Sequence, residues 1–160
     1  MSGDASNGTS VFSAKDSTII TNKGDSFYVT NTTAKINLEN ITITNKDESG
    51  NFLRIQKDSW GQNGSNGGNV TLNMTKQNVK GNIVVDSIST LIMNLQNKSC
   101  WEGIINGDND ASSITLKLDK SSKIKLMGDS YVSSLDNADT TNSNIDFNGY
   151  TLYVNGVAVN

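Results

Sequence analysis

Two tryptophans stand beside amide or carboxylate side chains, a combination of residue types that can bind a sugar. Trp60 precedes Gln62 and Asn63 in a glycine-rich segment, and Trp101 is followed directly by Glu102. The apolar face of a pyranose ring packs on an aromatic ring, while nearby amides and carboxylates bond to its hydroxyl groups. These five residues are the candidate ligand-binding residues, although each tryptophan would also suit the core. The tyrosines are instead expected to seal the core or its ends: Tyr28, Tyr131, Tyr150 and Tyr153.

One acidic segment has the first spacing of a calcium loop. Asp108 and Asp110 stand two residues apart, and Ser112 follows as a third oxygen donor. A complete loop also needs a glycine for its sharp turn and a distal glutamate, but these positions hold Ser113 and Asp119. A turn is the favoured interpretation. No metal site or cofactor is expected, with Asp108 and Asp110 as weak candidates and calcium as the open alternative.

The residue types that usually carry catalysis are scarce. The chain has no histidine, and Arg54 is its only arginine. Without histidine, the single cysteine, Cys100, has no obvious activating base, and a small buried apolar residue is the favoured interpretation. Asp86, Asp108 and Asp119 follow strand-like segments, where capping of turns is the expected role. We therefore expect no catalytic residues and no enzyme activity.

Composition limits the partners of the chain. The net charge of its 160 residues is −3, so a basic stripe for nucleic acid is not expected. No apolar run approaches the roughly 18 residues of a membrane span, so membrane insertion is not expected either. Asparagine, serine and threonine are abundant and proline is absent, which is typical of strands that are paired on both sides.

The elements that must position these side chains recur at a fixed interval. Alternating apolar stretches begin at Val70, Leu91 and Ile114, which are 21 and 23 residues apart, and Gly81 is followed by Gly103 in a second series. A period in this range marks a solenoid, in which each turn of chain buries its apolar side on the next. We predict an all-β, single-stranded right-handed parallel β-helix with about 22 residues per coil. The competing architecture, an antiparallel sandwich, is supported by six Asn-Gly pairs but gives no reason for the repeat.

The chain divides into three parts of one domain. Residues 1–24 are expected to form an N-terminal cap, residues 25–135 the β-helix coils and residues 136–160 an antiparallel hairpin cap. The hairpin is predicted from the Asn-Gly pairs at 148–149 and 155–156. Inward asparagines are expected to stack as amide ladders at the corners between strands, with Asn82, Asn97 and Asn106 as candidates.

Several stretches resemble a known family. Residues 81–87, 102–107, 116–122 and 144–156 are similar to bacterial extracellular right-handed parallel β-helix domains of the pectate-lyase-like kind, known as carbohydrate-binding or adhesin-like surface proteins. The resemblance implies a secreted or cell-surface location and a glycan or host or cell-surface ligand. It leaves the oligomeric state open. A structural stalk or spacer is the alternative function, and a polysaccharide lyase or hydrolase relative is a further one.

Overall fold

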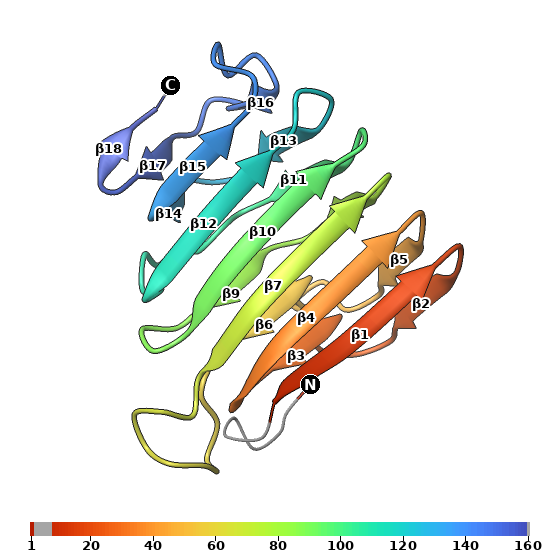
Figure 1. Ribbon diagram of the computed structural model, residues 1–160, viewed down its shortest axis with the longest axis vertical. Helices are drawn as coiled ribbons and strands as arrows, with labels where there is room; N and C mark the ends of the chain where they lie inside the picture. Colours follow the sequence, from red (N-terminus) through yellow and green to blue (C-terminus); the bar gives the residue numbers. More distant parts are fainter. Residues whose placement is uncertain (2–7, 160) are drawn as a thin grey trace.

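Short strands with inward apolar and outward polar residues stack into the three faces of a solenoid. The computed structural model describes residue 1 and residues 8–159, and this part is all β, with about six turns spaced roughly 23 residues apart. The predicted parallel β-helix is therefore confirmed, and the sandwich is excluded by the parallel pairing of neighbouring coils. Figure 1 shows the longest strands side by side, progressing from the first coil to the last.

Each coil contributes one strand to each face, with few exceptions. Face A is the six-stranded sheet of β1 Thr9–Lys15, β4 Thr32–Glu39, β7 Gly68–Thr75, β10 Thr90–Gln96, β12 Ser113–Leu118 and β15 Ser134–Asn137. Face B contains β2 Thr18–Thr21, β5 Thr42–Asn45, β8 Asn78–Lys80, β11 Cys100–Gly103, β13 Lys123–Leu126 and β16 Ile145–Asp146. Face C contains β3 Phe27–Val29, β6 Leu53–Ile55, β9 Ile83–Val85, β14 Ser130–Val132, β17 Leu152–Val154 and β18 Val157–Ala158. In the fourth coil, Ile105 alone bridges to Ile83 on face C.

The apolar repeat aligns in register along the axis of the solenoid. Met93 pairs with Leu72 on one side and Leu116 on the other, and all three side chains are fully buried. Ile105, two residues after Gly103 of the second series, is equally buried. Stacking each inward side chain on its equivalent in the next coil removes the apolar surface from water and stabilises the fold.

The two ends of the described chain differ in how they pair. Within residues 1–24, expected as a cap, β1 pairs in parallel with β4 and β2 pairs with β5, so this segment includes strands of the first coil. Residues 2–7 of that cap lie outside the described residues. At the other end β17 pairs with β14 in parallel and with β18 in the antiparallel sense. The hairpin turn is Asn155-Gly156, both with positive φ, as such turns require.

A buried polar stack occupies the corner between faces A and B. Its members recur once per coil: the backbone N–H of Gln77 donates to the Ser99 hydroxyl (3.1 Å), and the N–H of Ser99 donates to the Ser122 hydroxyl (3.2 Å). The Asn144 amide continues the stack by donating to the carbonyl oxygen of Ser122 (3.1 Å). The expected inward positions of Asn82 and Asn97 are wrong, because both are exposed in turns. Asn106 is buried, at a different corner.

Candidate functional site

Two tyrosines on the outer side of face C form a stacked aromatic pair. Tyr131 of β14 lies directly opposite Tyr153 of β17 in a parallel register. Their ring centroids are 4.8 Å apart and their planes differ by only 6°. Alternation places Val132 and Leu152 inside, so both rings stand on the outer surface, where they are half-buried. Neither ring therefore lies in the core, which corrects the first of the two roles expected for these tyrosines, the core or its ends.

A hollow of about 350 Å³ opens beside this pair. Its lining combines the two aromatic rings with small polar groups: Asn106, Asn109, Ser133 and Asn155. The side chains of Asn109 and Asn155 are exposed, and neither makes a hydrogen bond within the part of the chain that the structure describes. They therefore offer amide donors and acceptors to a ligand in the hollow.

The floor of the hollow is fixed by Asn106. Its side-chain oxygen accepts hydrogen bonds from the backbone N–H groups of Asp110 (3.1 Å) and Ala111 (3.2 Å). Its amide nitrogen is 3.5 Å from the carbonyl oxygen of Tyr131. A single buried amide thus ties the turn that carries Asn109 to the strand that carries the tyrosine. Both sides of the hollow are held in position before any ligand binds.

The acidic turn next to the hollow contains the weak metal candidates. Asp108 and Asp110 are both exposed there, flanking Asn109. Among residue 1 and residues 8–159, no three carboxylate, cysteine or histidine side chains gather into a group that could hold a metal ion. The turn is ordered by Asn106 and by the bond from the N–H of Asn109 to the carbonyl oxygen of Asn106 (2.8 Å).

The predicted tryptophan loop lies elsewhere, between β6 and β7. Trp60 is 43% exposed, and Gln62 and Asn63 beside it are also exposed. Asn66 holds the loop, because its buried amide donates to the carbonyl oxygens of Asp58 (2.8 Å) and Trp60 (2.9 Å). The sequence-predicted cluster of Trp60, Gln62 and Asn63 thus stays together on the surface. In Figure 1 this loop projects beyond the N-terminal end of β7.

The second predicted cluster is not available to a ligand. Trp101 is 1% exposed and stacks inside face B between Val79 and Ile124. The buried ring is part of the core, and its indole N–H has no partner in the described structure. Glu102 points outward and forms an ion pair with Lys80 (3.0 Å). Alternation also corrects the expectation for Cys100, which is exposed because its neighbour Trp101 takes the inward position.

Arg54 and Asp86, two of the residues considered for catalysis, are engaged in structural contacts. Arg54 is paired with Asp25 (2.6 Å). Partial burial alone would raise the pKa of Asp25, but hydrogen bonds from Arg54 and Asn51 hold it below its usual range. Asp86 accepts hydrogen bonds from the backbone N–H groups of Lys57 and Ile88, which is the turn-capping role that the sequence indicated for it.

Face A carries an outward amide ladder that the sequence did not reveal. Asn37 donates to the Ser13 hydroxyl (2.9 Å), Asn73 donates to Asn37 (2.8 Å), and Asn94 donates to Asn73 (2.7 Å). Each link joins adjacent coils, so the ladder fixes the rotamers of a polar row across the sheet. Shallow hollows of about 340 and 250 Å³ flank its two ends.

Comparison with known proteins does not assign the chain to a family. No family model matches the chain, and neither a curated protein nor a solved structure matches it. Within the described residues, no helix is long and apolar enough to cross a membrane.

Proposed function

We propose that this protein is a non-catalytic glycan-binding module that uses the Tyr131–Tyr153 hollow as its principal site. The observation that carries the proposal is the stacked tyrosine pair beside unengaged asparagine side chains. Aromatic rings supply the apolar contact that a pyranose needs, and the amides of Asn109 and Asn155 supply partners for its hydroxyl groups.

Preorganisation supports this proposal. The tyrosines belong to paired strands and the turn beside them is fixed by Asn106, so a ligand would order few side chains on binding. Rigid sites lose less conformational entropy on binding, which favours affinity. The volume of the hollow, about 350 Å³, lies at the lower end of the range for small-ligand pockets. The Trp60 loop is the second contact area of the proposal, because it presents another exposed aromatic ring with neighbouring amides.

The proposal includes a secreted or cell-surface location, with a glycan or cell-surface ligand as the partner. This location rests on the resemblance of residues 81–87, 102–107, 116–122 and 144–156 to extracellular β-helix domains. The alternative is a structural stalk, for which the stacked coils and the in-register ion pairs such as Lys80–Glu102 would be sufficient. The two functions differ in one measurable property, since a stalk binds no sugar.

Glycan-array screening, followed by calorimetric titration of the best sugar, tests the proposal. Tyr131→Ala and Tyr153→Ala should each weaken binding at least tenfold, because each removes one ring of the platform. Trp60→Ala should weaken binding to longer glycans only, if these reach the second contact area.

Tyr150→Ala is the matched control. Tyr150 is 39% exposed and does not line the hollow, so this variant should bind as the wild type does. Circular dichroism melts of all four variants show whether the fold is kept. Equal binding by Tyr131→Ala, Tyr153→Ala and the wild type would eliminate the hollow, and the absence of binding across the array would favour the stalk.

A further inference from the structure

The corner between faces A and B uses one left-handed residue at the end of each of the first four face A strands. Asp16, Asn40, Lys76 and Asn97 occupy equivalent positions in the first four coils, with φ values between 49° and 55°. Asparagine and aspartate tolerate this conformation because their short polar side chains bond locally. Lysine has no such compensation. Lys76 is therefore the exception among the four.

A second lysine in the same unusual conformation lies on the next coil. Lys98 has φ 66° and directly follows Asn97, the residue equivalent to Lys76. Neither Lys76 nor Lys98 forms an ion pair within residues 8–159, whereas other lysines, such as Lys80, do. Residues held in sparsely populated backbone conformations cluster at active sites and ligand clamps.

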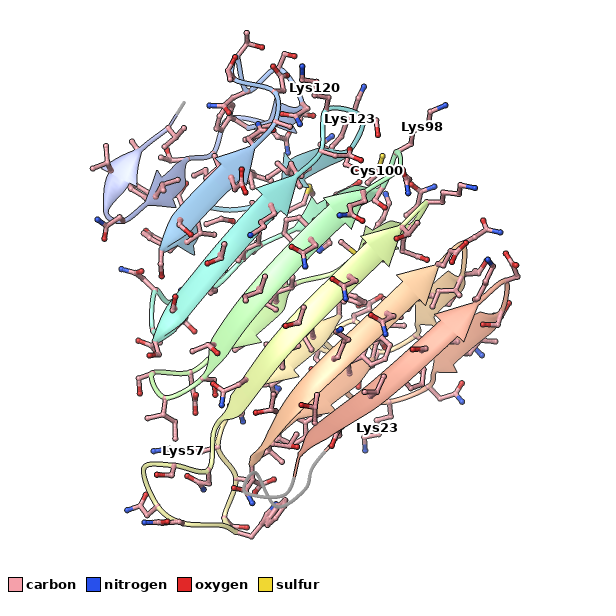
Figure 2. All side chains as sticks on the ribbon, viewed as in Figure 1. Lys23, Lys57, Lys98, Cys100, Lys120 and Lys123 are labelled. Atoms are coloured by element: carbon pink, nitrogen blue, oxygen red, sulfur yellow. The ribbon has the colours of Figure 1, made fainter. Side chains whose placement is uncertain are left out.

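The two lysines line one hollow of about 420 Å³. Asn97 and Ser121 complete its lining, and the Ser121 hydroxyl accepts a hydrogen bond from the N–H of Lys98 (2.9 Å). Lys120 precedes Ser121, and Figure 2 shows Lys98, Lys120 and Lys123 gathered at this edge of the solenoid. This part of the corner therefore carries three lysines, Lys76, Lys98 and Lys120, beside the carboxylate of Asp119.

The carboxylate of Asp119, at the same corner, is engaged in hydrogen bonds. Asp119 accepts hydrogen bonds from the N–H groups of Asn97 (2.6 Å), Ser121 (2.9 Å) and Ser122 (2.8 Å), and from the Ser121 hydroxyl (2.9 Å). Its oxygens cap the turn of the corner through these hydrogen bonds and form no ion pair with Lys76 or Lys98 in the described structure.

We propose that the Lys76–Lys98 hollow binds a tetrahedral oxyanion, as a sulfate or phosphate group. Lysine ammonium groups bind phosphate and similar oxyanions as compact point charges. The anion is either a free ion or an ester on a polymer. This site is separate from the tyrosine hollow, since it lies between faces A and B rather than on face C, and it does not depend on the proposed glycan function.

The site is tested by comparing the binding of dextran sulfate with that of unmodified dextran, both measured by calorimetry at low salt. The double variant Lys76→Asn/Lys98→Asn should bind dextran sulfate at least tenfold more weakly than the wild type does. Asparagine suits the left-handed conformation at both positions, so this variant should melt at the same temperature or higher. Loss of binding therefore cannot be attributed to unfolding.

The matched control is Lys23→Asn/Lys46→Asn, which removes two exposed lysines from neighbouring coils at another corner. Figure 2 shows Lys23 well away from the Lys98 edge. Binding by this control should change less than twofold. Equal weakening in both double variants would show that the effect comes from net charge alone, and it would overturn the site. Equal affinity of the wild type for dextran and for dextran sulfate would also overturn it. If millimolar inorganic sulfate displaces dextran sulfate, the site binds the free ion. If inorganic sulfate does not displace it, the site requires the ester on a polymer. Either result supports the site.

Discussion

One buried glutamine replaces a missing stretch of backbone pairing. No ladder joins β5 to β8, but the Gln77 side chain bonds to both backbone groups of Ile41: it accepts from the N–H (2.9 Å) and donates to the carbonyl oxygen (2.7 Å). Gln77→Leu should destabilise the fold by about 2–4 kcal/mol, because two buried backbone groups would lose their partners. Urea unfolding measures this change.

The exposed Gln96→Leu, one coil along at the same corner, serves as the control for this prediction. It makes the same chemical change where water satisfies the amide, so its effect should stay within about 0.5 kcal/mol. Similar losses in both variants would show that the side-chain bridge to Ile41 does not support the second and third coils.

In short strands it was hardest to predict from the sequence which side chains point inward, because few alternating residues are available to set the pattern. Trp101 and Cys100 are neighbours, so one must point inward and the other outward. The recurrence of Val79, Trp101 and Ile124 at intervals of 22 and 23 residues places Trp101 inside, and the structure agrees with that count. The chemical preference of cysteine for burial gave the opposite, incorrect answer.

At the scale of elements, the recurring glycines are explained by close approach between coils. A Cβ atom on Gly103 would lie 2.4 Å from the carbonyl oxygen of Gly81 and 2.7 Å from the ring of Trp101. Gly103→Ala should therefore destabilise the fold by about 1–3 kcal/mol through overpacking. At Gly107 the nearest atom is the Ile104 Cγ2 at 3.1 Å, so Gly107→Ala should cost less. Thermal unfolding of Gly103→Ala and Gly107→Ala measures this difference in stability. An equal change in both variants would contradict the close-approach explanation.

The strands with a regular period could be predicted from the sequence, but the rows of outward side chains that run across neighbouring strands could not. The apolar stretches at Val70, Leu91 and Ile114 aligned as expected because no insertion separates their coils. Between β4 and β7 the register step rises to 36 residues, from Thr33 to Asn69, because the Trp60 loop is inserted. That insertion hid the equivalence of Asn37 and Asn73, and with it the amide ladder. The tyrosine pair was within reach of the sequence, because Tyr131 and Tyr153 stand 22 residues apart, which is the predicted period. It was missed because residues 136–160 were expected to form a hairpin cap rather than a further coil.

Across the whole molecule, the carboxylates whose pKa is lowered most accept hydrogen bonds at corners and form no ion pair with a lysine in the described structure. Burial alone would raise the pKa of Asp119, but the backbone N–H of Asn97 and the donors of Ser121 and Ser122 lower it to about 2. Hydrogen bonds from Ser143 and Thr141 lower the pKa of Asp139 to about 2 as well. Four of the five ion pairs in the described chain have well-exposed lysines and contribute little, so the corners dominate the response to acid.

Acid should therefore unfold this protein over a defined pH window. A carboxyl group whose folded pKa lies below its unfolded value of ~3.9 contributes stability that is complete at neutral pH and is lost as protons bind. The melting temperature should thus fall as the pH decreases from about 4 to about 2.

Asp119→Asn/Asp139→Asn should be less stable than the wild type at pH 7 but should lose less stability across this window. Asp108→Asn/Asp110→Asn removes the same charge where neither carboxylate accepts a hydrogen bond in the described structure, so it should follow the wild-type profile. Parallel profiles for all three proteins would mean that repulsion among the 13 cationic side chains, rather than the capped corners, drives acid unfolding.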